Sequence, residues 1–363
     1  MPRPLWALLV LCGAIFAGLR AVLPFFNSWP SALFTRDFSN LWLGGKLALE
    51  GRVDIIYDLA AFRDATFEIL GVNFLNNYSY PPHSLLLAAP FGAMPYWLAL
   101  SVWNVGSLAL FYLAARPLIP KELPWWVVVF SPASLMCLVW GHYGLVCGAL
   151  WLWSFRGHGA AAALLTIKPH LGLLVAVQLL RDRRGLLVSI VGAAAFVALS
   201  IAAFGIAPWR DWLTTTFSYQ VQLLDGHRPA MFTTSVAPVI VYGLAGQAIF
   251  AVAAILLLTR NFNVFTAATA TFLILPYGFH YDLTVVCFGF VLLLATQWRD
   301  LTTTSRCIAF LAYLTPALVT LGSWMAPPIL LAGLWVQVRY LIMTEGATNS
   351  IPDAAANRRA ALR

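Results

Sequence analysis

The stretch LLVSIVGAAAFVALSIAAFG, residues 186–205, carries no charged side chain. As a helix, a run of this length crosses the roughly 30 Å hydrocarbon core of a bilayer. Apolar runs recur along most of the 363-residue chain, in which 61% of residues are hydrophobic and 10% are charged. Soluble domains average about 25% charged residues. The sequence therefore predicts an all-α, polytopic transmembrane helical bundle.

The apolar runs define the expected elements, roughly 10–13 membrane segments in all. Residues 5–26 could pass for a signal peptide, but they contain Arg20 and lack a clean cleavage site, so we expect a first span there. A short element at 78–95 is expected to be re-entrant, and 158–180 to form a hairpin that turns at Lys168-Pro169, because proline removes an amide donor. Further spans are predicted at 96–115, 125–140, 142–156, 186–205, 237–258, 262–279, 283–298, 305–320 and 327–343.

The loops and the tail complete the expected organisation. One integral-membrane domain is predicted over 1–345, followed by a disordered cytoplasmic tail at 346–363. Its first extracytoplasmic loop, 27–81, has apolar residues at helical spacing in two places, which predicts two amphipathic helices on the outer membrane face. A second extracytoplasmic loop is predicted at 206–236.

The distribution of charge indicates topology rather than a nucleic-acid partner. The net charge is +8, but the basic residues are scattered between apolar runs instead of gathering on a polar domain. A cytoplasmic N-terminus puts most Lys and Arg inside, as the positive-inside rule prefers. We therefore expect a multi-pass protein of the plasma (inner) membrane. The five cysteines show no paired spacing, which argues against a disulfide framework or a CxxC metal site.

Ionisable groups collect on the predicted outer side. An ionisable group at membrane depth is costly unless it is partnered or faces a wet cavity, so such a cluster is a functional candidate. Simpler interpretations remain open: Asp37 as the N-cap of a helix starting at Phe38, Lys168 and Arg20 as snorkelling side chains, and His142 as a hydrogen-bonded core histidine. The cluster consists of Arg36, Asp37, His83, His142, Lys168, His170, His227, Arg228, His280 and Asp282.

Six short motifs, in order, carry a family resemblance. They are RDF (36–38), ALEGRVDIIYD (48–58), YSYPP (78–82), GH (141–142), IKP (167–169) and FHYD (279–282). This order resembles glycosyltransferase family 87, membrane-embedded enzymes of GT-C type that use polyprenyl-phosphate sugars. The family is best known for polyprenyl-phosphate-mannose-dependent α-mannosyltransferases. One departure is that the family usually has Gly-Gln where this chain has Gly141-His142.

The resemblance implies roles for individual residues. The family's proposed catalytic base corresponds to Asp37, a conserved histidine to His280 and its Lys-Pro to Lys168-Pro169. Cationic groups would receive the donor phosphate through charge-assisted hydrogen bonds. The candidates for phosphate binding are Lys168, Arg36, Arg20 and Arg228 beside His280. The candidates for substrate binding are Tyr80, His83, His142, His170, Tyr281 and Asp282.

The implied reaction is an inverting transfer of a sugar, mannose first, to a lipid or glycan acceptor at the extracytoplasmic face. No cofactor is expected, and metal independence is expected because the chain contains no DxD pair. The alternative is a transporter or lipid flippase, although proton-coupled carriers need ionisable groups partway across the membrane and the charges here lie on one face. A non-catalytic scaffold for envelope assembly is a third possibility.

Overall fold

The computed structural model describes residues 8, 9, 11–13, 15, 34, 36–72, 77–216 and 234–341. In this part of the chain regular structure is helical, and the extended pairing assigned there is one isolated bridge between Ser235 and Phe279. The all-α prediction is thereby confirmed. Most of the predicted first span, together with Arg20, His227, Arg228 and the tail, lies outside the described residues.

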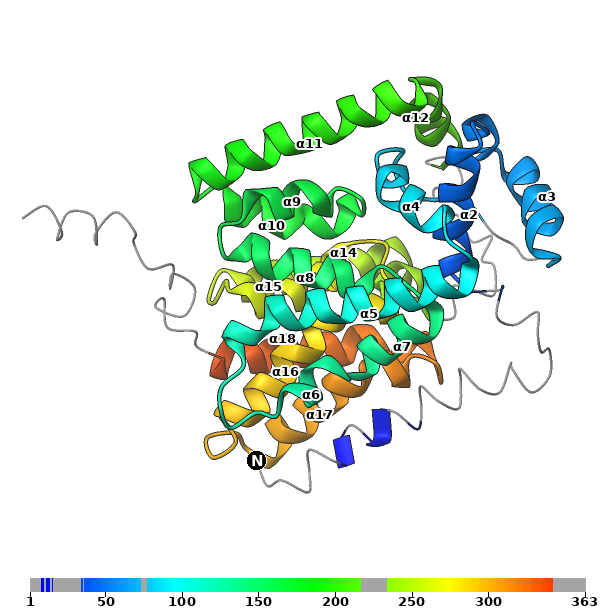
Figure 1. Cartoon of the computed structure of the whole chain (residues 1–363). Coiled ribbons are helices and arrows are strands. Elements are labelled where there is room, and N and C mark those ends of the chain that lie inside the picture. Colours follow the sequence, from blue (N-terminus) through cyan, green and yellow to red (C-terminus); the bar gives the residue numbers. More distant parts are fainter. Residues whose placement is uncertain are drawn as a thin grey trace, which may run out of the picture.

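The helices form a bundle with a cap at one end (Figure 1). The cap, at the right of Figure 1, consists of α2 (Phe38–Leu49), α3 (Leu59–Leu70), α4 (Ser84–Gly92) and α12 (Ala207–Asp211). The bundle consists of α5 (Tyr96–Ala115), α6 (Trp125–Val129), α7 (Pro132–Trp140), α8 (Gly144–Phe155), α9 (Gly159–Leu165), α10 (Leu173–Leu179), α11 (Arg183–Phe204), α14 (Pro238–Leu258), α15 (Val264–Ile274), α16 (Thr284–Thr296), α17 (Thr303–Leu318) and α18 (Ala326–Tyr340).

Burial separates a central layer from the perimeter. In α8 and α16 nearly every residue is buried, whereas α11 buries only Gly185 and Ser200. Helix α11 packs along α9 and runs along the upper edge of the bundle in Figure 1. Its large apolar side chains, such as Leu187 and Ile190, are exposed. An apolar helix exposed on most sides fits a lipid-facing position.

Three described helices are long and apolar enough to cross a membrane: Tyr96–Leu118, Arg183–Phe204 and Pro238–Leu258. Other apolar helices occur where spans were predicted but are shorter, among them Gly144–Phe155 and Thr284–Thr296. At 1.5 Å per residue, about 12 residues cover roughly 18 Å, less than the hydrocarbon core. The positions of these apolar segments are predicted correctly, while their lengths as helices are overestimated.

Proline explains two of these differences. The predicted span 125–140 is broken into α6 and α7, because Ser131 is extended before Pro132 and its side chain accepts a hydrogen bond from Ser134 N–H. The span predicted at 262–279 ends at Ile274, two residues before Pro276. The predicted hairpin is confirmed, since α9 and α10 flank a turn at Lys168-Pro169.

The two helices predicted in the first loop are present, but they differ in burial. Helix α3 is amphipathic and buries Phe62, Ala65 and Thr66. Helix α2 is mostly buried and packs closely on α4, so the prediction that it lies on the membrane face is wrong. A Cβ at Gly45 would overlap the carbonyl oxygen of Ala88, and one at Gly92 would overlap the backbone of Lys46. Both glycines are therefore needed for this approach.

Candidate active site

Three turns between consecutive bundle helices bring chemistry-bearing residues together. Gly141-His142 connects α7 to α8, Lys168-Pro169 connects α9 to α10, and the short 3-10 helix His280–Asp282 precedes α16. The first and the last of these turns are more than a hundred residues apart along the chain. Lys168 and His142 nevertheless both lie within 4.0 Å of Asp282. The FHYD, IKP and GH motifs therefore form one site.

A buried ion pair lies at the centre of the site. Lys168 Nζ donates to Asp282 Oδ1 at 2.6 Å, and the two side chains are 5% and 0% exposed. The second carboxylate oxygen, Oδ2, accepts a bond from the backbone N–H of Phe279 at 3.4 Å. Loss of either charge would leave the other buried without compensation, so the pair fixes both side chains.

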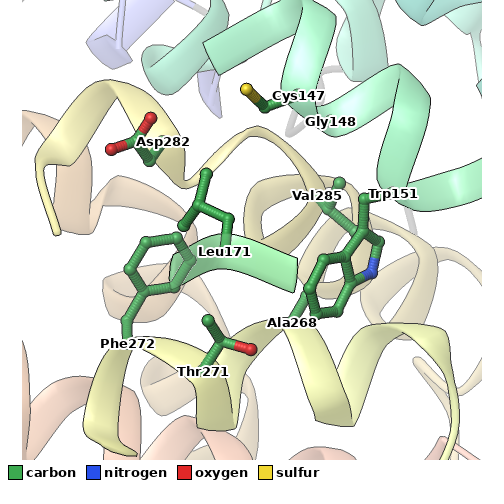
Figure 2. Close-up of a pocket in the computed structure, with 9 residues that line it drawn as sticks. All are labelled: Cys147, Gly148, Trp151, Leu171, Ala268, Thr271, Phe272, Asp282 and Val285. Atoms are coloured by element: carbon green, nitrogen blue, oxygen red, sulfur yellow. The ribbon is translucent and has the colours of Figure 1, made fainter. Parts of the chain in front are cut away.

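Below the ion pair lies a small, mainly apolar cavity of about 20 Å³, which has room for about one water molecule. Figure 2 shows Asp282 at its rim, with Leu171 and Phe272 beside it and Trp151 on the far side. Because the lining of this cavity offers few polar groups, the Asp282 carboxylate depends on Lys168 and the backbone for its hydrogen-bond partners. The cavity is lined by Cys147, Gly148, Trp151, Leu171, Ala268, Thr271, Phe272, Asp282 and Val285.

His142 is held against the ion pair by aromatic contacts. Gly141 ends α7 with φ of 63°, a conformation that favours glycine, and this turn directs His142 into the site. The imidazole lies over Tyr281, with ring centroids 3.5 Å apart, and Nε2 is 3.3 Å from the hydroxyl of Tyr80. Its Nδ1 has no hydrogen-bond partner and lies 4.0 Å from Asp282 Oδ1.

Asp37 occupies the N-cap position of α2, but its side chain does not cap the helix. It retains some accessible surface. Burial raises the pKa of Asp37 to about 6, an effect that the nearby charge of Lys168 opposes and that of Asp282 reinforces. The charges of both members of the ion pair therefore act on this carboxylate. A side chain that served only as a cap would bond to α2 instead.

Tyrosines fill the space between these groups. Burial, and after it the charge of Asp37, raises the pKa of both Tyr80 and Tyr281. Tyr277, which we did not predict, belongs to the same group and contacts His170 with ring centroids 5.2 Å apart. Its position three residues before His280 is the signal that could have identified it.

The backbone of these tyrosines is fixed by residues that the motifs do not reveal. Tyr57 Oη donates to the carbonyl of Tyr80 at 2.8 Å, and Cys137 Sγ donates to the carbonyl of Tyr281 at 3.1 Å. A Cβ at Gly144 would overlap that same Tyr281 carbonyl. Such supports depend on tertiary contacts and carry no local sequence pattern.

The remaining predicted residues differ in their placement. His280 is 4% exposed, and its ring contacts Tyr281 with centroids 5.0 Å apart, so it lies in the site. Burial lowers the pKa of the Arg36 guanidinium, and the charge of Tyr96 opposes this shift. His83 stacks on Trp209 at 5.6 Å and bonds to Thr166 Oγ1 at 3.1 Å, partners outside the cluster around Asp282.

Chemically, the site offers the Asp37 carboxylate, one ammonium and several imidazoles within a largely buried setting. The carboxylate can accept a proton, and the ammonium and imidazoles can bind an anion. Among the described residues, no group of three or more His, Cys, Asp or Glu side chains is arranged to hold a metal ion.

Comparison with known proteins identifies one family. Residues 78–276, more than half of the chain, match the profile of glycosyltransferase family 87. The matched region includes YSYPP, GH and IKP, while Asp37 and the FHYD motif lie outside it. Neither the curated proteins nor the solved structures include a match.

Proposed function

Because the chain belongs to glycosyltransferase family 87 and is thus a membrane glycosyltransferase, we propose that it transfers a sugar from a polyprenyl-phosphate donor. The observation that carries this proposal is the buried Lys168–Asp282 pair, whose two charges both act on the Asp37 carboxylate. A donor that already carries phosphate as leaving group needs a base for the acceptor and cations for the phosphate, and both are present.

In the proposed reaction the acceptor hydroxyl attacks the anomeric carbon from the face opposite the phosphate, with inversion. Asp37 takes the hydroxyl proton as the new glycosidic bond forms. The bond from the anomeric carbon to the phosphate oxygen breaks, and the electron pair leaves with the lipid phosphate. Lys168 and His280 stabilise the charge that develops on this phosphate, in a site where burial strengthens each interaction.

Mannose is the proposed sugar because of the family resemblance of the six motifs, and the acceptor is proposed to be a lipid or glycan of the envelope. Tyr80, Tyr281, His142 and His170 surround the reacting groups and supply aromatic faces and polar edges suited to a sugar. His83, whose partners lie outside this cluster, and Arg36 are assigned secondary roles at its margin.

The donor class is tested with purified protein in detergent and two radiolabelled donors, polyprenyl-phosphate mannose and a nucleotide-linked mannose. We expect label to move to membrane lipids or glycans from the lipid-linked donor alone, with no loss when a chelator is added. Transfer from the nucleotide donor would overturn the proposed donor class. The transporter alternative predicts sugar or lipid movement across sealed vesicles with no covalent transfer.

The site is proposed to face the extracytoplasmic side of the plasma membrane, which the charge distribution supports. Glu68 on α3 and Glu122 before α6 are both exposed and are expected on opposite sides. In intact cells, a membrane-impermeant maleimide should label Glu68→Cys and leave Glu122→Cys unlabelled until the membrane is opened. The reverse pattern would invert the orientation.

A further inference from the structure

One polar atom in the centre of the site is not explained by the reaction described above. Nδ1 of His142 is buried, has no hydrogen-bond partner and lies 4.0 Å from Asp282 Oδ1. The residue itself is 4% exposed, so water is largely excluded from it. A buried nitrogen without a partner is unfavourable and calls for an explanation.

The contacts of the ring define the orientation of this nitrogen. The opposite nitrogen, Nε2, is 3.3 Å from Tyr80 Oη. A hydroxyl that donates to Nε2 leaves the proton of neutral imidazole on Nδ1. That arrangement is favoured electrostatically, because an N–H and not a lone pair then faces the carboxylate of Asp282. In that tautomer Nδ1–H lies 4.0 Å from a carboxylate oxygen that already accepts a hydrogen bond from Lys168.

Basic side chains offer two nitrogens within 4.0 Å of Asp282 Oδ1 in the described structure: Lys168 Nζ at 2.6 Å and His142 Nδ1 at 4.0 Å. An N–H···O bond has an optimum near 2.9 Å, so a shift of about 1 Å would close the His142 contact. Tyr281 packs against the imidazole and is the residue directly before Asp282, so ring and carboxylate are held side by side.

A donor phosphate would draw the Lys168 ammonium away from Asp282. The charge of Lys168 lowers the pKa of Asp37 against the larger effect of burial, so the ammonium acts on Asp37 as well as on Asp282. A phosphate arriving beside Asp37 competes with Asp282 for this ammonium. If Lys168 turned to the phosphate with no replacement, the buried Asp282 Oδ1 would lose its hydrogen-bond donor, which is strongly unfavourable.

We propose that His142 is a positioning residue that takes over Asp282 when Lys168 turns to the donor phosphate. In the unliganded site Lys168 holds Asp282, and in the loaded site Nδ1–H of His142 holds it. The exchange lowers the cost of moving Lys168 and so strengthens phosphate binding. The lipid-phosphate ligand rests on the proposed function, whereas the capacity of His142 to replace Lys168 does not.

Two variants of His142 separate this role from packing. His142→Phe keeps an aromatic ring over Tyr281 but has no donor, and His142→Gln keeps an N–H donor but loses the ring. We expect His142→Phe to weaken binding of undecaprenyl phosphate in detergent micelles about tenfold, as for a hydrogen bond to a charged group. His142→Gln should stay within about threefold of the parent. In turnover, the loss in His142→Phe should appear mainly in KM for the donor.

A packing role predicts the opposite order, with His142→Gln the weaker binder, and that order would overturn the proposal. Equal loss in both variants, or none in His142→Phe, would also overturn it. If the parent protein itself fails to bind undecaprenyl phosphate while it binds a nucleotide sugar, the proposed donor class is wrong and the exchange on phosphate fails with it.

A stability cycle tests the exchange without any substrate. In a Lys168→Met background Asp282 has lost its ammonium, so His142 should already hold it. The thermal midpoint should then fall further on His142→Phe in this background than in the parent, which is a coupling between the two sites. Equal falls in the two backgrounds would show that His142 does not replace Lys168, whatever the donor of the enzyme is.

Discussion

The two helices of the first loop both begin directly after an aspartate, and the two aspartates behave differently. Asp58 caps α3, with one carboxylate oxygen accepting bonds from Ala60 N–H at 2.9 Å and Ala61 N–H at 3.0 Å. Asp37 stands at the same position before α2 and makes no capping bond. The charges of Lys168 and Asp282 act on its carboxylate instead. The same residue type at the same helix position is structural in one case and available for chemistry in the other.

The largest expected effect separates the two aspartates directly. Asp37→Asn should reduce sugar transfer by about 10²- to 10⁴-fold, the range expected for loss of a general base. The substitution removes no capping bond, so the thermal midpoint in detergent should not fall. Asp58→Asn is the matched control and should transfer sugar at the parent rate. Transfer by Asp37→Asn at a near-parental rate would reduce Asp37 to a structural residue.

Removal of the cation that Asp37 and Asp282 share should have the next largest effect, this time on folding. Lys168→Met leaves the fully buried Asp282 carboxylate without its partner, which costs about 3–5 kcal/mol for pairs of this kind. Thermal unfolding in detergent measures the loss, and Lys121→Met, at an exposed position, is the control. The double variant Lys168→Met/Asp282→Asn should recover part of the stability, and a lack of recovery would contradict the ion-pair explanation.

The pH dependence of transfer and of stability should reveal the ionisation of Asp37. A base whose pKa is raised to about 6 is ionised above that value, so transfer should rise about tenfold per pH unit below 6 and level off above it. Because the pKa in the folded state exceeds the unfolded value, ionised Asp37 opposes folding: its unfavourable contribution grows as pH rises from about 4 to 6 and then stays constant. Asp37→Asn should remove that contribution. A rate that does not change between pH 5 and pH 8 would argue against Asp37 as base.

The close packing of α2 on α4 positions Asp37, and a side chain added at this contact should disturb it. Gly45→Val places side-chain atoms where the Ala88 carbonyl lies, and overpacking of this kind costs about 1–3 kcal/mol. Transfer should fall along with stability, because Asp37 begins the same helix. Gly106→Val is the control in α5, since no atom lies within 4 Å of its Cβ position. A fully active Gly45→Val protein would mean that α2 does not position the base.

The smallest expected effect concerns the cap itself. Asp58→Ala removes the two bonds to the start of α3 and should cost about 1 kcal/mol, the usual value for an N-cap aspartate. Thermal unfolding measures this loss, and transfer should be unaffected. Asp37→Ala, compared in the same experiment, should show no capping loss. Asp58→Ala should therefore lose stability and keep its activity, whereas Asp37→Ala should lose activity without that loss of stability.

Which of these aspartates has a capping role was not evident from their local sequences, because both precede apolar helical patterns. The sequence did predict helices within 39–51 and 56–70, which correspond to α2 and α3, and the hairpin at Lys168-Pro169, since apolar spacing and proline act locally. It also directed attention to Lys168, His280 and Asp282 through short motifs. Arg36 is adjacent to Asp37 in the sequence, and the residue whose charge acts on it is Tyr96.

The sequence by itself therefore determined the all-helical membrane class and the order of the apolar segments, because hydrophobicity and proline act over a few residues, and it supplied the residues proposed for the chemistry. Tertiary structure alone decided that Lys168, His142 and Asp282 meet within 4.0 Å, that α2 is buried on α4, and that Tyr277 joins the site. Such contacts join turns distant in the chain, and they depend on how whole helices pack, which no local pattern encodes.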